Sequence, residues 1–282
     1  MEQLNPITNA MTVDVEDYFQ VSAFETVVTR SSWDSLPCRV EQNTDRILQL
    51  FADHEVHGTF FMLGWVAERY PALIQRIVTA GHELASHGFS HVRVTAQDQE
   101  SFREDVLRTR KLLEDLSGTP VVGYRAASYS IGRDNLWAHE VLAEVGYCYS
   151  SSIYPIYHDL YGMPEAPRFA FRSTQAPILE IPVTTVEIFG YKFPCGGGGY
   201  FRLLPYHLFR WALRRVNQHD NQPSIFYFHP WEIDPDQPRQ QGINIKTRVR
   251  HYLNLQHMEQ RLLQLLKDFQ WDRMDRVFAS KI

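Results

Sequence analysis

Short apolar runs alternate along the chain with segments whose apolar residues recur at helical spacing. The runs are five or six residues long and bounded by turn-forming residues, which is typical of buried strands. They predict strands at residues 10–15, 59–63, 83–87, 121–125, 147–151, 178–183, 224–228 and 276–280. The helical spacing predicts helices at residues 42–53, 71–80, 98–116, 134–145, 205–218 and 246–269. An unbroken alternation of strand and helix indicates an α/β fold with a mostly parallel sheet covered by helices.

Polar residues lie at or just after the ends of several predicted strands: Asp14 and Glu16, His87 and His91, Arg125 and His229. In a β/α barrel the carboxyl ends of the strands meet at one mouth, so this placement favours a closed or nearly closed barrel over an open sheet. The irregular segment 152–176 is predicted to be a loop over that mouth. No linker or repeat divides the chain. We therefore expect one domain over residues 1–282, with residues 200–282 closing the barrel.

Composition limits the class of protein. The chain has 282 residues, of which 44% are hydrophobic and 13% aromatic, so it can bury a large core. A net charge of −5 gives no basic face of the kind that a general nucleic-acid binder needs. No run approaches 18 apolar residues, and residues 1–11 lack a signal-peptide pattern. With three scattered cysteines, these features predict a cytoplasmic protein without a transmembrane segment, with a place at the inner-membrane periphery as the alternative.

The candidate chemistry centres on two histidines four residues apart. His87 and His91 follow a predicted strand, and a tight turn or a first helical turn would put both imidazoles on one side. The acidic cluster Asp14-Val15-Glu16-Asp17 follows another strand. Two histidines and one carboxylate form a three-ligand site that leaves room for water, which is the arrangement of a catalytic metal ion rather than a structural one.

With these residues in view, the chain resembles the polysaccharide deacetylases of the NodB-homology type, carbohydrate esterase family 4. Within that family it is similar to the branch found with bacterial exopolysaccharide and exosortase gene clusters. The resemblance covers nearly the whole chain, and it rests on the order and spacing of several motifs rather than on any one of them. These motifs are Thr12–Phe19 (TVDVEDYF), Ser86–His91 (SHGFSH), Gly123–Ile131 (GYRAASYSI), Gly196–Arg202 (GGGGYFR) and His229–Asp234 (HPWEID).

The resemblance implies a distorted (β/α) barrel of about seven parallel strands with outer helices. It also implies roles for the polar residues: a general base, an arginine that orients it, a general acid and three metal ligands. Carried over by position, these are Asp14, Arg125, His229, and the ligands Glu16, His87 and His91. The family's first motif has adjacent aspartates, whereas here Asp-x-Glu is followed by Asp17, which stays open as the alternative carboxylate ligand. The expected ion is Zn²⁺, with Co²⁺ and Ni²⁺ as alternatives.

Further positions are expected to meet the substrate. A backbone N–H near Ser128 or Tyr129 would stabilise an oxyanion, and Tyr200 and Trp231 would offer rings to a sugar. Two departures from the family's pattern bear on activity. Ala127 stands where relatives have proline, and Ser150 stands where an aspartate is expected, so Glu232 or Asp234 would have to replace that carboxylate.

The sequence thus predicts a metal-dependent hydrolase that removes N-acetyl groups from a bacterial polysaccharide containing N-acetylhexosamine, or from its lipid-linked precursor. The expected partner is the N-acetylated glycan, with no nucleic acid. Two alternatives stay open at this point. One is an allantoinase-like hydrolase of a cyclic amide, and the other is a glycan-binding pseudo-deacetylase in an exopolysaccharide assembly system. The glycan's identity and the oligomeric state are left open by the sequence.

Overall fold

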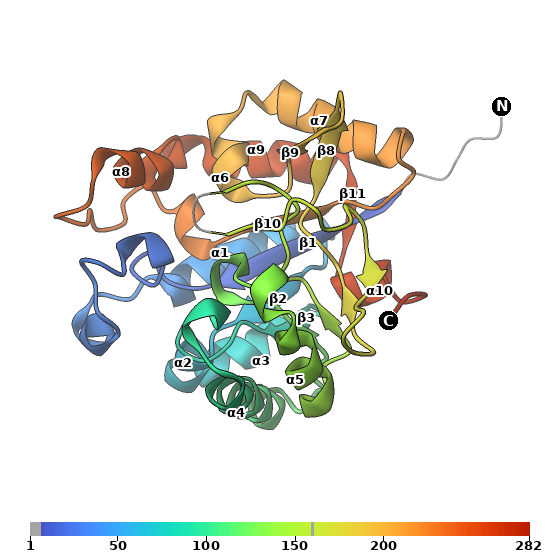
Figure 1. Cartoon of the computed structure of the whole chain (residues 1–282). Helices are drawn as coiled ribbons and strands as arrows, with labels where there is room; N and C mark the ends of the chain where they lie inside the picture. Colours follow the sequence, from blue (N-terminus) through green and yellow to red (C-terminus); the bar gives the residue numbers. More distant parts are fainter. Residues whose placement is uncertain (1–6, 159–160) are drawn as a thin grey trace.

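A computed structural model describes residues 7–158 and 161–282 (Figure 1). Its centre is a nine-stranded sheet in which neighbouring strands follow the order β10-β1-β2-β3-β4-β5-β7-β6, with β11 also paired to β1. The strands of this sheet are β1 (Thr8–Val15), β2 (Thr59–Met62), β3 (Glu83–Ser86), β4 (Gly123–Tyr124), β5 (Tyr149–Ser150), β6 (Phe171–Arg172), β7 (Leu179–Glu180), β10 (Ile225–Phe228) and β11 (Gln270–Asp272).

Every strand pair in this sheet is parallel except β6 with β7. The sheet curls into a half-barrel with helices around it, which confirms the predicted α/β class and barrel type (Figure 1). Seven parallel strands, from β10 through β7, form the main path. Strands β8 (Thr185–Ile188) and β9 (Tyr191–Pro194) form a separate antiparallel hairpin.

The C-terminal segment 200–282 adds to one end of the sheet rather than closing it. It supplies β10 and β11, which both pair with β1, and in the described part of the chain no strand joins β10 to β6. The free edge of β10 is instead covered by the chain before α6: the Tyr227 N–H donates to the Gly196 carbonyl at 2.8 Å, and the Ile225 N–H donates to the Thr184 hydroxyl at 2.6 Å. That one domain spans the whole chain stays a prediction.

Helices surround the curled sheet. They are α1 (Val40–Ala52), α2 (Gly64–Arg69), α3 (Pro71–Thr79), α4 (Gln99–Ser117), α5 (Trp137–Val145), α6 (Gly198–Leu203), α7 (Tyr206–Gln218), α8 (Ile245–Tyr252), α9 (Leu255–Asp268) and α10 (Met274–Val277). Short 3₁₀ turns are η1 (Ser22–Phe24), η2 (Arg30–Ser35), η3 (Val94–Ala96), η4 (Ala127–Tyr129), η5 (Arg133–Asn135) and η6 (Pro230–Ile233). Within the described residues, no helix has the length and apolar content needed to span a membrane.

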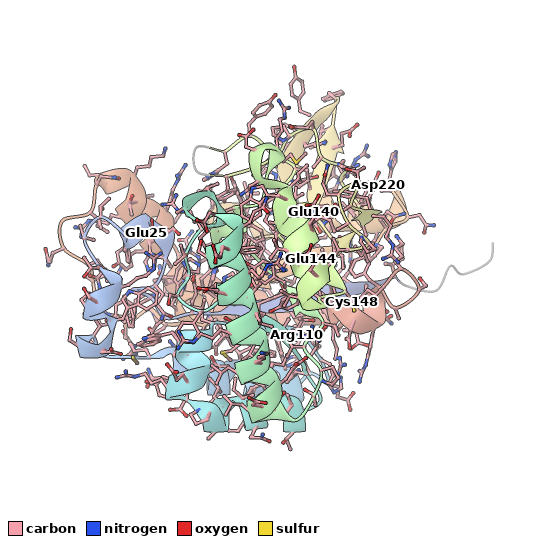
Figure 2. All side chains as sticks on the ribbon, turned by 60° about the horizontal axis from the view of Figure 1, so that its bottom comes forward. Glu25, Arg110, Glu140, Glu144, Cys148 and Asp220 are labelled. Carbon is pink, nitrogen blue, oxygen red and sulfur yellow. The ribbon has the colours of Figure 1, made fainter. Side chains whose placement is uncertain are left out.

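Helices α4 and α5 pack against each other in the outer layer. They lie side by side, with Arg110 on α4 and Glu140 and Glu144 on α5 (Figure 2). Helix α4 begins with a capping box in which Asp98 accepts the Ser101 N–H at 2.9 Å, and it ends at Gly118 in the left-handed conformation. Because these caps satisfy the helix ends locally, the sequence marks the bounds of α4 well.

Two predictions near the C-terminus are wrong. The single helix expected over residues 246–269 is two helices, α8 and α9, separated at Asn254, whose φ is +55°. The guanidinium of Arg202 donates to the carbonyls of His251 and Leu253 at 3.0 and 2.6 Å, which gives partners to carbonyls at the end of α8. The strand expected at 276–280 is absent: α10 occupies Met274–Val277, a turn follows it, and the last strand is β11.

Candidate active site

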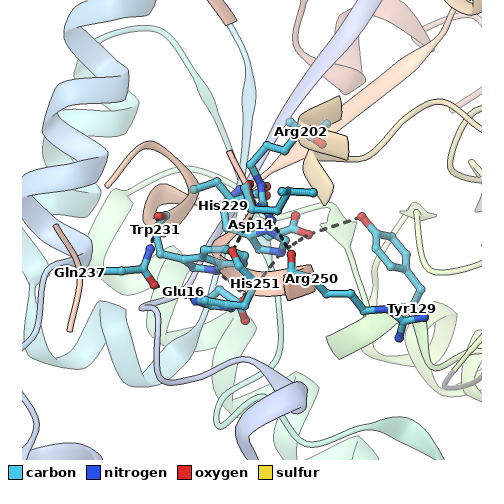
Figure 3. Close-up of polar contacts among 12 residues, drawn as sticks. Asp14, Glu16, Tyr129, Arg202, His229, Trp231, Gln237, Arg250 and His251 are labelled. Carbon is cyan, nitrogen blue, oxygen red and sulfur yellow. Dashed lines mark hydrogen bonds and ion pairs between the residues drawn. The ribbon is translucent and has the colours of Figure 1, made fainter. Parts of the chain in front are cut away.

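Strand β1 places two carboxylates at the carboxyl end of the sheet. Asp14 lies within β1, and Glu16 lies just past its end; both side chains are almost fully buried. Because β1 sits between β10 and β2 in the curled sheet, the carboxylates lie beside residues that follow β3, β4 and β10. Figure 3 shows Asp14, Glu16 and His229 drawn together at this place.

Arg125 fixes one oxygen of Asp14. Its Nη1 lies 2.5 Å from Asp14 Oδ1 and 2.9 Å from the Thr12 hydroxyl, while Nε and Nη2 donate to the carbonyl and hydroxyl oxygens of Ser151. The arginine is fully buried over the ring of Phe61, 3.9 Å from the centroid. The second oxygen, Oδ2, has only longer contacts, 3.5 Å to the Tyr129 hydroxyl and 3.9 Å to His229 Nε2. Asp14 is therefore held by one oxygen and free to act with the other.

Glu16, His87 and His91 converge as a candidate metal site. One ligand atom from each residue lies within 4.8 Å of the others, and all three side chains are buried. Glu16 Oε2 lies 2.9 Å from His91 Nε2 but has no well-directed hydrogen-bond partner, and His91 Nδ1 has none either. A buried carboxylate oxygen without a hydrogen-bond partner, beside two imidazoles, fits a site built for an ion. Two imidazoles with one carboxylate suit Zn²⁺.

The pKa values of His87 and Glu16 favour the protonation states that bind a cation. Burial lowers the pKa of His87 to about 4, so its ring is neutral near pH 7. The Nδ1 atom of that ring lies 2.8 Å from the Arg125 carbonyl, which leaves Nε2 as the ligand atom. Burial alone would raise the pKa of Glu16, but the nearby His91 and His229 outweigh it and lower this pKa to about 2.

The loop that carries the two histidines is a turn rather than a helix. Gly88 and His91 both have positive φ, +73° and +52°. Asp105 on α4 accepts the Phe89 N–H at 3.1 Å, and Arg30 donates to the carbonyls of Ser90 and His91 at 2.7 and 3.0 Å. A left-handed histidine is uncommon, and contacts from both sides hold it in that conformation.

Asp17, the alternative carboxylate ligand, is placed elsewhere. Its carboxylate accepts the backbone N–H groups of Tyr18, Arg39 and Val40, at 2.9, 2.6 and 2.9 Å. Val40 begins α1, so Asp17 caps that helix from a distance in sequence. Burial raises the pKa of Asp17 to about 6. The geometry therefore favours Glu16 as the ligand.

His229 approaches both carboxylates from β10. Its Nε2 lies 3.4 Å from Glu16 Oε1, and its Nδ1 lies 2.7 Å from Glu232 Oε1. Burial would lower the pKa of His229, but the charges of Glu16 and Glu232 raise it to about 9. Glu232 is held in turn by Arg202, whose Nε donates to Oε2 at 2.7 Å. Of the two carboxylates considered for this support, Glu232 fills it, since Asp234 instead pairs with Arg39 and Asn43.

Trp231 lies in a stack of three rings. His229 covers one face at a centroid distance of 5.1 Å, and His251 from α8 covers the other at 4.1 Å (Figure 3). Little of the Trp231 side chain is therefore exposed, and its stacking on a sugar stays a prediction. Its Nε1 donates to Glu16 Oε1 at 3.4 Å, so the indole contacts the carboxylate.

The other residues expected to bind substrate lie in two places. Ser128 and Tyr129 form η4 with φ of +54° and +51°, and Tyr129 is almost fully buried beside Asp14. The Tyr129 N–H donates to the Ala126 carbonyl at 3.0 Å, so this amide serves the turn rather than an oxyanion. Tyr200 is half-buried in α6, on the run of glycines.

That run serves packing within the chain. A Cβ on Gly197 would lie 2.6 Å from the ring of Tyr227, and one on Gly198 would lie 2.3 Å from the Glu232 carboxylate. The glycines thus let α6 begin close to Glu232, the partner of His229.

Three supporting residues carry no sequence signal of their own. Arg202, Ser151 and His251 touch the site through Glu232, Arg125 and Trp231. Arg202 lies in a motif of the resemblance, but only its burial in the fold marks it as a partner of Glu232. Ser150, at the position of the expected aspartate, donates to the Ser152 hydroxyl, while its neighbour Ser151 binds Arg125.

Two segments of the chain match known protein families. Residues 26–149 match the family described as polysaccharide deacetylase, and residues 151–279 match one described as a domain of unknown function, DUF3473. A peptidoglycan-N-acetylglucosamine deacetylase from Bacillus cereus is 33% identical over 75 residues, which are 27% of this chain and 27% of that protein. A chitooligosaccharide deacetylase from Rhizobium leguminosarum bv. trifolii is 33% identical over 100 residues, 36% of this chain and 44% of the relative. The chain thus spans less than half the length of either relative.

Solved structures share the fold. A candidate polysaccharide deacetylase from Mycobacterium smegmatis superposes with a TM-score of 0.62 at 18% identity, covering 99% of this chain and 94% of that one. A carbohydrate esterase family 4 pseudoenzyme from Bacillus anthracis superposes with a TM-score of 0.50 at 12% identity, covering 97% and 66%. The matched segment 26–149 contains His87, His91 and Arg125. Residues 26–149 therefore match the polysaccharide deacetylase family, and the chain shares the fold of a solved structure described as a polysaccharide deacetylase.

Proposed function

We propose that this protein is a metal-dependent N-deacetylase that hydrolyses the N-acetyl groups of a glycan containing N-acetylhexosamine. The observation that supports this most is the convergence of a buried metal-type triad with Asp14 and His229. Amide hydrolysis needs an activated nucleophile, a base and an acid within reach of one carbon atom. This mouth of the sheet offers candidates for all three.

Glu16, His87 and His91 would hold the ion. A divalent ion bound there would polarise the acetyl carbonyl and lower the pKa of water toward about 7. The neutral ring of His87 and the ionised Glu16 need no proton removed before they bind a cation near pH 7. Zn²⁺ is the ion proposed first, because two imidazoles and a carboxylate with room for water form its usual catalytic set.

Asp14 is the proposed base. Arg125 and the Thr12 hydroxyl hold its Oδ1 side, so Oδ2 faces the mouth and can accept a proton from an attacking water. The arginine also keeps the buried carboxylate from being an unpaired charge. A carboxylate fixed through one oxygen needs little reorganisation when the proton moves.

His229 is the proposed acid. Its Nε2 points to the carboxylates of the site, and its Nδ1 is bound to Glu232, so the proton available for the leaving amine is the one on Nε2. A pKa of about 9 keeps the imidazole protonated near neutral pH, as an acid must be. As the amide bond breaks, that proton passes to the leaving nitrogen.

The substrate class is proposed from the relatives, whose names give peptidoglycan and chitooligosaccharides as substrates. Both are glycans with N-acetylglucosamine, so an N-acetylated hexosamine is the shared feature. A lipid-linked precursor of an exopolysaccharide is the finer proposal for the glycan itself. It would be tested by comparing turnover of free and lipid-linked oligosaccharides.

The first test is metal content and acetate release from the same preparation. After removal of metal by a chelator, titration should restore one zinc per chain, and the double variant His87→Ala/His91→Ala should bind none. The zinc-loaded protein should then release acetate from N-acetylated chitooligosaccharides. No zinc binding by the wild-type chain would contradict the metal mechanism.

A second candidate function is a glycan-binding pseudo-deacetylase. The fold similarity to a pseudoenzyme motivates it, whereas the presence of Asp14, both histidines and His229 speaks against it. Tight zinc and glycan binding, with no acetate released from any N-acetylated oligosaccharide, would favour this alternative.

The allantoinase-like alternative would be indicated by turnover of a small cyclic amide without added metal.

A further inference from the structure

The hairpin β8–β9 ends in a phenylalanine that is almost completely exposed. Ile188 pairs with Tyr191, so Phe189 and Gly190 alone form the turn. Both have positive φ, +51° and +79°, as in a type I′ turn. That turn favours Asn or Gly at its first position, and a bulky aromatic residue there is strained. The side chain of Phe189 is nonetheless 96% exposed, so its packing within the chain does not compensate.

More apolar surface continues from this tip. The pairs Val186–Phe193 and Ile188–Tyr191 put four apolar side chains on one face of the hairpin. Val186 is buried, but Phe193 and Tyr191 remain 48% and 72% exposed. The rest of the chain therefore covers only part of this apolar face and leaves Phe193 and Tyr191 largely in contact with solvent.

Helix α7 extends the same surface. It packs beside β8, and Arg215 Nε donates to the Glu187 carbonyl at 3.4 Å. Trp211 lies one turn before Arg215, and Leu208 lies three residues before Trp211, so all three share one side of the helix. Trp211 and Leu208 are each about half exposed. Hairpin and helix lie together at the top of Figure 1, away from α4 at the bottom.

The charge around this surface is positive, in contrast to the chain as a whole. Residues 188–219 contain five Lys and Arg and no Asp or Glu, whereas the net charge of the protein is −5. One of the five, Arg202, is buried against Glu232, and the other four lie on the hairpin and α7. Arg210 and Arg214 share one carboxylate, Asp268, and Lys192 donates to the carbonyls of Pro164 and Ala166. The acidic residue of the hairpin, Glu187, is paired across the strands with Lys192, on the face opposite to the apolar one. An excess of positive charge therefore surrounds the exposed rings.

From these observations we infer that the hairpin β8–β9 and helix α7 dock the protein on an anionic lipid bilayer. Phe189 inserts at the acyl boundary, Tyr191, Phe193 and Trp211 lie at the headgroup level, and the arginines contact lipid phosphates. A protruding tip suits a soft bilayer, whereas a protein partner would need a matching cavity. A second copy of the chain is disfavoured, because a two-fold interface would set this positive patch against itself.

Docking of this kind does not depend on the proposed function, because it can be measured without substrate. It would bring a deacetylase to glycans carried on lipids. It would also give the peripheral membrane location, considered from the sequence alone, a physical basis in named side chains.

The test is flotation of the full chain with vesicles of phosphatidylcholine, with and without phosphatidylglycerol. Wild-type protein should float with the anionic vesicles, and Phe189→Asn should weaken this partition by about tenfold or more. Asparagine suits the turn better than phenylalanine, so this variant should melt at the same temperature or higher, which separates lost binding from lost folding. Trp211→Gln should weaken partition as well, and Leu107→Gln on the exposed face of α4 is the matched control that should not.

Three results would overturn the inference. The first is wild-type protein that floats with neither kind of vesicle. The second is Phe189→Asn that binds as well as wild type. The third is concentration-dependent self-association of the wild type, seen by light scattering and lost in Phe189→Asn, without vesicle binding; that would assign the surface to a second copy. Zinc binding and acetate release should be unchanged in Phe189→Asn, so failure here leaves the proposed activity standing.

Discussion

Two buried arginine–carboxylate pairs flank the candidate active site, and they hold their carboxylates differently. Arg125 and Asp14 join β4 to β1 at 2.5 Å, and Arg202 and Glu232 join α6 to η6 at 2.7 Å. All four side chains are at most 2% exposed. In the first pair one carboxylate oxygen is free of short contacts, whereas in the second both oxygens are engaged, by Arg202 and by His229.

The difference separates a reacting carboxylate from a positioning one. A group that must accept a proton keeps an open oxygen and is oriented through the other, as Asp14 is. A group that fixes a neighbouring imidazole has its oxygens satisfied, as Glu232 does. Similar chemistry and burial thus serve two purposes, and the occupancy of the second oxygen distinguishes them.

The largest expected effect comes from removing the charge of the free oxygen. Asp14→Asn keeps the shape of the side chain and its contact with Arg125 but cannot accept a proton, so acetate release should fall by about 10²- to 10⁴-fold. Initial rates on an N-acetylated chitooligosaccharide, with zinc bound, measure this. Zinc affinity should change little, because Asp14 is not among the three converging ligands. A folded Asp14→Asn protein with wild-type rates would refute the assignment of the base.

The next effect concerns the two acidic residues that follow β1. Glu16→Gln should weaken zinc binding by more than about a hundredfold, since a ligating charge is lost, which exceeds the effect expected of an outer partner. Asp17→Asn is the matched control, because Asp17 accepts N–H groups of the backbone at the start of α1. It should lower the melting temperature while leaving zinc affinity close to wild type. Competition with a chelator of known affinity gives both constants, and a reversed order would make Asp17 the ligand.

A smaller effect is expected in the second pair. Glu232→Gln keeps a side chain that can bond to His229 but removes the charge that stabilises its protonated form, so turnover should fall by about ten- to a hundredfold. The basic limb of the pH–rate profile should also move to lower pH, because the pKa of His229 falls toward its ordinary value. Asp234→Asn, which touches Arg39 and Asn43 instead, should leave the profile in place. An unchanged profile in Glu232→Gln would remove Glu232 from this role.

The first half of the chain could be predicted well, because its signals are local. Strands β1, β2 and β3 are short apolar runs, and the polar residues that the fold brings to the mouth lie at or just past the ends of β1 and β3. Helix α4 begins with Asp98 and ends at Gly118, both visible in the sequence. The parallel order of the sheet then fixes the proximity of Asp14, His87 and Arg125, so a sequence pattern was enough to bring these residues together.

The second half of the chain could be predicted less well, because its structure depends on contacts between residues distant in sequence. The break between α8 and α9 is invisible in the apolar periodicity, since Arg202 supplies the partners of the carbonyls before it. The ring stack of His229, Trp231 and His251 joins β10, η6 and α8, and no spacing rule predicts it. The terminal apolar residues were assigned to a strand although α10 begins where the Met274 N–H bonds to the Thr59 hydroxyl.

The smallest expected effect concerns His82, a buried histidine whose pKa is lowered by burial, whereas carboxylates raise the pKa of His229. His82 is 5% exposed and packs on Phe51 and Phe60, and its Nδ1 accepts the Gly58 N–H at 3.1 Å. Burial lowers its pKa from 6.5 to about 4, helped by the positive charge of nearby His57 and Arg273. Above pH 6.5 both folded and unfolded chains hold this ring neutral. As the pH falls from 6.5 toward 4, the unfolded chain gains a proton that the folded chain does not, so stability declines.

His82→Gln should remove that part of the decline while keeping an acceptor for the Gly58 N–H. Urea unfolding at about pH 7.5 and about pH 5.5 should show the wild type losing on the order of 1 kcal/mol more than the variant between the two conditions. Equal losses in the two proteins would mean that His82 takes up its proton in the folded state. In that case the contrast between a histidine controlled by burial and His229, controlled by Glu16 and Glu232, would not hold.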